Sequence, residues 1–108
     1  MKPTETALYS TVEPEMLDLV ELFVDELPDR LGATRIAYDR ADWPMLSLLA
    51  GQMTTAGFNY GFPQICPVAK QLAEQAEAGS VEEEVLDTLR QLQALGRRIR
   101  AGMPPSGD

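Results

Sequence analysis

The stretch that decides the fold is 42–63, which reads DWPMLSLLAGQMTTAGFNYGFP. At 100° per residue, its apolar side chains gather on one side of a helix. The residues on that side are Leu46, Leu49, Met53, Ala56 and Tyr60. Asp42 is a good N-cap residue, Pro44 is tolerated in a first turn, and Gly61 is typical of a helix end. The sequence therefore predicts a helix from Asp42 to about Tyr60 that buries this stripe.

The opposite side of the same helix is unusual for a surface. Its residues are Pro44, Ser47, Leu48, Gly51, Thr54, Thr55 and Phe58. A glycine inside a helix costs about 1 kcal/mol relative to alanine, and core packing does not ask for one at Gly51. Leu48 and Phe58 are large apolar groups that point outward. They are either scattered surface residues or part of a small protein-contact patch, and Phe58 could instead fold under the turn at 61–63.

The flanking segments also have helical periodicity, and no strand pattern competes with it. A run from Pro14 to Ile36 contains Pro28, which predicts a kink or a break. The apolar positions of this run are Leu17, Val20, Phe23, Val24, Leu27, Leu31 and Ile36. Further helices are expected from about Pro63 to Gly79 and from Ser80 to Gly102, the last beginning with a capping box at 80–83. The apolar stripe of the last helix is Val81, Val85, Leu89, Leu92, Leu95 and Ile99.

Short connections between long amphipathic helices favour antiparallel neighbours. We therefore expect an all-α fold, an antiparallel up-down four-helix bundle over residues 13–102. Residues 1–12 are expected to form a flexible N-terminal arm, and residues 103–108 a disordered tail.

Composition limits the function of this 108-residue chain. Its net charge of −8 argues against nucleic acid and anionic membrane surfaces as partners. It has one cysteine, so no internal disulfide is possible, and it has no histidine. The missing histidine removes Ser–His and Cys–His catalysis as well as histidine metal sites. No apolar run approaches the ~20 residues of a membrane span, so we expect a cytoplasmic monomer with no cofactor and no metal.

The remaining candidate sites have ordinary structural interpretations. Cys66 lies near a helix N-terminus but has no base available, so we interpret it as a semi-buried small residue. The acidic residues Glu82, Glu83 and Glu84 fall in the first turn of a helix, where the helix dipole stabilises negative charge. The arginines of the last turns, Arg97, Arg98 and Arg100, suit the dipole in the same way, although they could also contact an acidic partner. The five methionines are interpreted as core or chance.

The segment 49–63, LAGQMTTAGFNYGFP, resembles the signature of histidine-containing phosphotransfer (HPt) domains. That signature reads approximately Leu-Ala-His-Gln-Leu-Lys-Gly-Ala-Gly-Gly-Ser-Tyr-Gly-Phe-Pro. The resemblance extends upstream to 19–31 and 41–43, and downstream to 69–74 and 97–98, so that it covers roughly residues 8–102. It implies the HPt-like form of the four-helix bundle.

The departures from the signature fall on its chemistry. Gly51 stands where the family has its phosphate-accepting histidine, and Thr54 stands where the family has a lysine that neutralises phosphate. Thr55 and Phe58 fill positions that are small in the family, whereas Met53, Ala56 and Tyr60 keep the core side. The resemblance therefore implies the fold of the family but not its phosphotransfer activity. No catalytic residues are expected in this chain.

The resemblance implies a non-catalytic role, and we do not expect an enzyme. The expected function is a pseudo-HPt protein-interaction module in two-component phosphorelay signalling of the bacterial type. Its partner would be a response-regulator receiver domain or a histidine kinase, bound without accepting phosphate. The expected partner-binding face consists of Ser47, Leu48, Gly51, Gln52, Thr54, Thr55 and Phe58. The alternative is a structural or self-associating helical bundle with no signalling partner.

Overall fold

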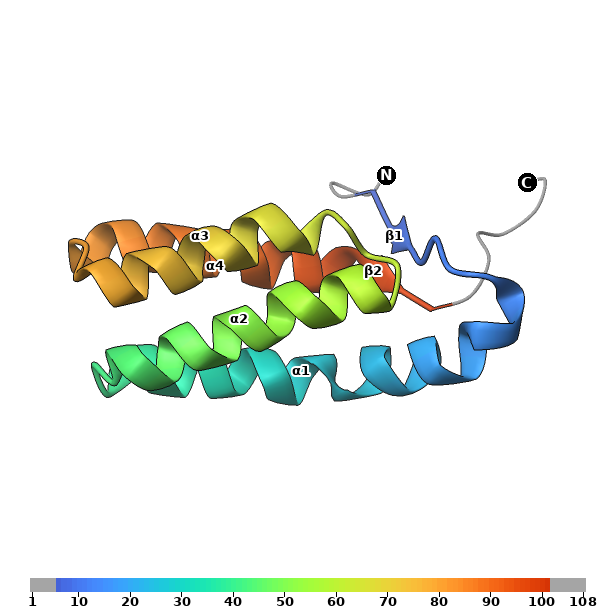
Figure 1. Cartoon of the computed structure of the whole chain (residues 1–108), viewed down its shortest axis with the longest axis horizontal. Coiled ribbons are helices and arrows are strands. Elements are labelled where there is room, and N and C mark those ends of the chain that lie inside the picture. Colours follow the sequence, from blue (N-terminus) through green and yellow to red (C-terminus); the bar gives the residue numbers. More distant parts are fainter. Residues whose placement is uncertain (1–5, 102–108) are drawn as a thin grey trace, which may run out of the picture.

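The protein is described here by a computed structural model, which covers residues 6–101 (Figure 1). Its described part is mostly helical and consists of four helices packed side by side. These are α1 (Leu17–Asp39), α2 (Trp43–Asn59), α3 (Ile65–Ala78) and α4 (Glu82–Arg98). A short 3₁₀ turn, η1 (Pro14–Met16), precedes α1, and two short strands, β1 (Leu8–Tyr9) and β2 (Ile99–Arg100), flank the helices. The prediction of an all-α four-helix bundle is confirmed at this level.

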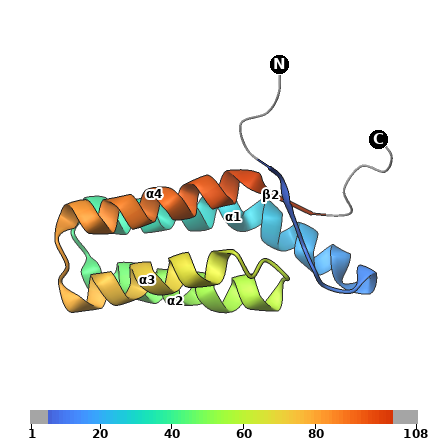
Figure 2. The same ribbon diagram turned by 90° about the horizontal axis from the view of Figure 1, so that it is seen from above.

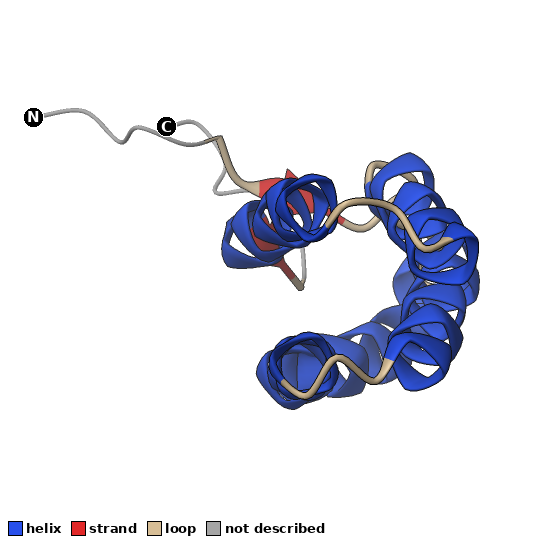
Figure 3. Ribbon diagram, turned by 90° about the vertical axis from the view of Figure 1, so that its left-hand side faces the viewer, coloured by secondary structure: helices blue, strands red, loops and turns tan. Residues whose placement is uncertain are grey.

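The helices are joined by short turns, and the chain reverses direction at each of them (Figure 1). Figure 2 shows α1 with α4 on one side of the molecule and α2 with α3 on the other. Viewed along their axes, the helices follow a C-shaped curve (Figure 3). The closest helix pair is α2 with α3. The largest fully buried side chains come from all four helices and from the α2–α3 turn: Phe23, Leu46, Met53, Phe62, Ile65, Leu72, Leu89 and Leu92.

The boundaries of α2 and α3 largely follow the predicted signals. The Asp42 carboxylate accepts a hydrogen bond from the backbone N–H of Met45 at 3.3 Å, so Asp42 caps α2 as expected. Gly61, with a φ of 82°, forms the turn after α2, and Gly79, with a φ of 71°, ends α3. Both glycines occupy the left-handed region that other residues rarely adopt. Helix α3 begins at Ile65, close to Pro63 as predicted.

The predictions for Pro28 in α1 and for the N-terminal cap of α4 have different outcomes. Helix α1 is continuous through Pro28, so the predicted break is wrong and the predicted kink stays a prediction. The capping box at Ser80 is wrong, because the N-cap position of α4 is Val81 and no side chain caps it. The backbone N–H of Ser80 instead donates to the carbonyl of Gln75 at 3.1 Å, so Ser80 belongs to the turn that closes α3.

Two residues assigned to the apolar stripes are exposed. Ile36 is 53% exposed and Val81 is 61% exposed. Ile36 follows Leu31 by five residues rather than three or four, which rotates it well away from the buried side of α1. Val81 precedes the first turn of α4 and so lies outside the helix whose stripe it was expected to begin.

A parallel strand pair was not expected from the sequence. Leu8 pairs with Ile99 and Tyr9 with Arg100, although Ile99 was predicted to continue the stripe of the last helix. Leu8 is only 8% exposed and belongs to the core. The described part of the predicted flexible arm, residues 6–12, is therefore packed against the bundle, and we refer to it as the N-terminal strap.

Side-chain and backbone hydrogen bonds fasten the N-terminal strap to the turn after α2. The Ser10 hydroxyl donates to the carbonyl of Tyr60 at 2.7 Å, and the N–H of Thr11 donates to the carbonyl of Gly61 at 2.9 Å. These bonds satisfy carbonyls that the end of a helix leaves without partners. Residues 1–5 and the predicted tail at 103–108 lie outside the described residues. Among the helices that are described, none has the length and apolar character needed to cross a membrane.

Candidate functional site

Helix α2 has a buried side and an open side, broadly as its sequence predicts. Leu46, Met53 and Ala56 are buried, while Leu49 and Tyr60 are partly buried and pack against the core. The sequence missed Ala50 and Gly57, which are also buried on this side. On the other side, a Cβ atom placed on Gly51 would have no neighbour within 4 Å. Position 51 therefore projects any side chain it carries into open space.

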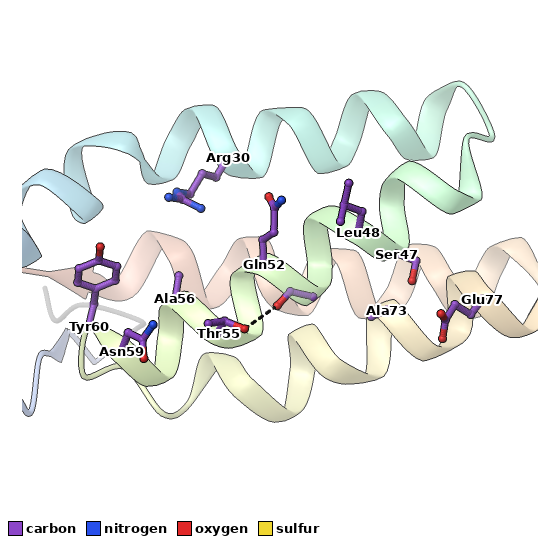
Figure 4. A pocket seen from close by; sticks show the side chains of 11 residues that line it. Arg30, Ser47, Leu48, Gln52, Thr55, Ala56, Asn59, Tyr60, Ala73 and Glu77 are labelled. Atoms are coloured by element: carbon purple, nitrogen blue, oxygen red, sulfur yellow. Dashed lines mark hydrogen bonds between the residues drawn. The ribbon is translucent and has the colours of Figure 1, made fainter.

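An open groove of about 730 Å³ runs along the outer side of α2, with α1 above it and α3 below it in Figure 4. Most of the predicted partner-binding face lines this groove, namely Ser47, Leu48, Gly51, Gln52 and Thr55. Leu48 is 56% exposed and supplies the large apolar surface of the groove. The structure thus brings these five residues together in one open groove.

The other two residues of the predicted face, Thr54 and Phe58, do not line the groove. Thr54 is half-buried on the side of α2 that faces the start of α3, and the thiol of Cys66 donates to its carbonyl at 3.4 Å. Phe58 is 77% exposed. The alternative that Phe58 folds under the 61–63 turn is wrong, because Phe62 is the fully buried aromatic residue of that turn.

The remaining groove residues were missed by sequence reasoning. Arg30 comes from α1, Ala73 and Glu77 come from α3, and Ala56, Asn59 and Tyr60 come from the last turn of α2 and the residue after it. Helical periodicity shows which side of each helix is apolar, but it does not show which turn of α1 or α3 lies beside Gly51. No signal in the sequence identifies Arg30 as a neighbour of this site.

Arg30 is held by an aromatic cluster at one end of the groove. Its guanidinium carbon lies 5.6 Å from the centre of the Phe23 ring, within the range of a cation–π interaction. The Phe23 ring in turn stacks on Tyr60, with centroids 5.0 Å apart and planes 11° apart. Figure 4 shows the Arg30 side chain extending from α1 toward α2, on the side of Ala56 and Tyr60.

The threonine hydroxyls in and beside the groove form only local hydrogen bonds. The hydroxyl of Thr55 donates to the carbonyl of Gly51 at 3.4 Å, and the hydroxyl of Thr54 donates to the carbonyl of Ala50 at 3.1 Å. Both are local bonds within the helix, and neither pairs a hydroxyl with a base that would activate it as a nucleophile. Within residues 6–101, no group of three His, Cys, Asp or Glu side chains is placed to hold a metal ion.

The other sequence candidates have local partners in the structure. Cys66 is half-buried beside α2. Glu82, Glu83 and Glu84 form the first turn of α4, where the helix dipole favours them. At the other end of α4, Arg98 donates from its Nε to the carbonyl of Thr6 at 2.6 Å and so helps hold the N-terminal strap.

Comparison with known proteins adds no evidence for a family assignment. No family model, curated protein or solved structure matches it. The resemblance to HPt domains therefore stays a prediction that rests on the residues quoted above.

Proposed function

We propose that this chain is an HPt-like, antiparallel up-down bundle that binds a signalling protein without exchanging phosphate. Its partner is a response-regulator receiver domain or a histidine kinase of a two-component phosphorelay. The observation that carries the proposal is position 51, which lines an open groove on α2, has open space at its Cβ position and is occupied by glycine. An acceptor side chain at this position would be free to reach a partner, and glycine supplies none.

The absence of phosphate exchange follows from the composition of the chain. A phosphorelay passes phosphate through a phosphoramidate on an imidazole nitrogen, and the 108 residues include no histidine. A phosphoester on Thr54 or Thr55 would be too stable to return phosphate readily to an aspartate. We therefore expect no acid-labile phosphate on the chain after incubation with a phosphorylated receiver or an autophosphorylating kinase. Radiolabel that remains on the chain as a phosphoramidate would contradict this expectation.

Binding is supported by the apolar surface of the groove. Leu48 is a large side chain of the predicted face that remains 56% exposed. Covering such a side chain on association contributes about 1.5–3 kcal/mol. The neutral polar residues around it, including Ser47, Gln52 and Thr55, can form the hydrogen bonds that usually border the apolar centre of an interface.

The direct test is to measure binding of the purified chain to a panel of receiver domains and kinase fragments by calorimetry. The Leu48→Ala variant should lose at least tenfold in affinity. The matched control is Leu22→Ala, because Leu22 is also 56% exposed but lies on α1 and does not line the groove. Equal losses from the two variants, or no binding to any member of the panel, would contradict the proposal.

One observation favours the alternative of a self-associating bundle. Leu19 and Leu22 are 51% and 56% exposed on α1 and lie outside the groove. Two copies of a chain with a net charge of −8 repel each other, so association through these leucines should strengthen with added salt. Sedimentation velocity over a range of protein and salt concentrations distinguishes a monomer, which we expect, from such a dimer.

A further inference from the structure

The groove beside Gly51 carries one positive side chain among the residues that line it, Arg30. Its one negative side chain, Glu77, comes from α3. Figure 4 shows the two at different ends of the groove, with Arg30 near Ala56 and Tyr60, and Glu77 beyond Ser47. The positive charge that lines the groove therefore lies at the end near Tyr60, where Glu26, which does not line the groove, forms an ion pair with it.

The guanidinium of Arg30 is poorly satisfied within residues 6–101. Its Nε atom is buried and has no hydrogen-bond partner. Its nearest carboxylate oxygen, on Glu26, lies 3.7 Å from Nη2, which is beyond hydrogen-bonding distance. Arg35 on the same helix provides a contrast, because its Nε donates to Asp39 at 3.0 Å. A guanidinium has five N–H donors, so Arg30 retains donor capacity that Arg35 has partly used.

The same guanidinium is held in place by apolar contacts. It lies over Phe23, which is 2% exposed and is stacked on both Tyr60 and Phe62. A buried ring between two others fixes the platform, so the guanidinium is held in place by a contact that uses none of its N–H donors. A preorganised group of this kind loses less entropy when a ligand binds to it.

We propose that Arg30 is the recognition site for a side-chain carboxylate of the protein that occupies the groove. The planar fork of a guanidinium matches a carboxylate, and the neighbouring Gln52 offers a neutral amide donor. A doubly charged phosphate fits less well, since Arg30 is the one cation lining the groove and the neighbouring carboxylate of Glu26 repels a dianion more strongly than a monoanion. That the occupant is a protein rests on the function proposed above, whereas the carboxylate preference can be measured without any protein partner.

The test uses the ¹⁵N-labelled full chain and two small probes, N-acetyl-aspartate N-methylamide and its asparagine analogue, at constant ionic strength. We expect the aspartate probe to shift the Nε–H signal of Arg30 along a saturating curve, with a roughly millimolar dissociation constant. The Nε–H signal of Arg35 is the internal control and should not follow that curve. The asparagine probe should shift neither signal. In the Arg30→Gln variant, the shifts that the aspartate probe causes in the Gln52 and Tyr60 amides should disappear.

Three results would overturn the proposal. They are equal responses of Arg30 and Arg35, equal effects of the two probes, and tighter binding of inorganic phosphate than of the aspartate probe. If a receiver or kinase binds the chain, Arg30→Gln should weaken the complex at least tenfold, whereas Arg35→Gln should not. If Arg30→Gln leaves the affinity of that complex unchanged, the carboxylate site is refuted but the proposed function is not. A selective response to the aspartate probe without any signalling partner refutes the proposed function but not the site.

Discussion

The two glycines of α2 stand in opposite surroundings. A Cβ atom on Gly57 would lie 3.0 Å from the Cβ of Ile65 and 3.1 Å from the carbonyl oxygen of Phe62, where α3 begins against α2. A Cβ atom on Gly51 would meet nothing within 4 Å. Packing therefore favours glycine at position 57, where a Cβ atom would push its neighbours aside, and sets no such limit at position 51. The residue at position 51 can change what the surface does without changing the fold, and four experiments test that separation.

The largest expected effect is the gain of an activity. The variant with Gly51→His, Thr54→Lys, Thr55→Gly and Phe58→Gly should remain folded and should accept phosphate from a cognate phosphorylated receiver. The histidine supplies a nucleophile in open space, and the lysine stabilises the charge that develops on the phosphoryl group. The two new glycines cost roughly 1 kcal/mol each. Acid-labile radiolabel on the chain is the measurement, and Gly51→His alone should acquire little.

The matched control for this variant carries the same three accompanying changes with Gly51→Gln in place of Gly51→His. It should bind the same receiver and acquire no label. If the histidine variant is folded and binds the receiver yet remains unlabelled, the backbone around position 51 differs from that of an active phosphotransfer domain. The resemblance would then not extend to the docking geometry.

The next largest effect concerns stability and compares the two glycines directly. Gly57→Val should destabilise the bundle by about 2–3 kcal/mol, because the added methyl groups have to displace Ile65 or the turn at Phe62. For a domain of this size that corresponds to a fall in melting temperature of roughly 10–20 °C. Gly51→Val should change the melting temperature little. Thermal unfolding followed by circular dichroism measures both, and similar losses at the two positions would contradict the comparison.

A smaller effect is expected at Phe58, the most exposed of the large apolar residues in the described chain. Phe58→Ala should weaken a confirmed complex by roughly 1–3 kcal/mol, because a buried aromatic side chain is a typical interface anchor. The melting temperature of the free chain should hardly change, since the side chain is 77% exposed. Ile36→Ala, at an exposed position on α1, is the control. Unchanged affinity would restrict the contact site to the groove itself.

The smallest effect is expected from Gly51→Ala, which should stabilise the bundle by up to about 1 kcal/mol through helix propensity. Gly32 on α1 also has nothing within 4 Å of its Cβ position, so Gly32→Ala should stabilise the chain by a similar amount. Denaturant unfolding of the two variants gives the comparison. A loss of stability confined to Gly51→Ala would mean that the backbone at position 51 is constrained in a way that open space does not explain.

The sequence predicted the helices well because their signals are local. Asp42 and Gly79 mark helix ends through their own side-chain and backbone chemistry, and the core stripe of α2 follows from a 3.6-residue period. Ser80 was misread because a capping motif in sequence competes with the closing turn of the preceding helix. The backbone N–H of Ser80 donates to that turn.

The strand pair could not be predicted because its signal is not local. Two residues are too short to show an alternating pattern, and the partner of Leu8 lies at the far end of the chain, at Ile99. Ile99 also falls in step with the apolar stripe of α4, so periodicity alone assigns it to the helix. The prediction that Ile99 is buried is confirmed, because its side chain is 2% exposed, but its backbone is extended rather than helical.

The sequence could predict the part of the candidate site that lies on α2 but not the part that comes from α1 and α3. The outward direction of Gly51 and Leu48 follows from their positions on one helix. Arg30 and Glu77 enter the same groove from other helices, and their placement depends on how far α1 and α3 slide along α2. That offset is set by packing such as the stacking of buried Phe23 on partly buried Tyr60, which sequence periodicity does not describe.

The N-terminal strap has a consequence for the order in which the molecule is assembled. The hydrogen bond between Thr6 and Arg98 joins residues 92 positions apart. During synthesis at about 5–20 residues per second, the first of these residues waits roughly 5–20 s before its partner exists. Helices α1, α2 and α3 can pair in that interval, whereas β1 has no strand to join. Closure of the strap is therefore expected to be a late event in biogenesis, completed only when the last turn of α4 has emerged.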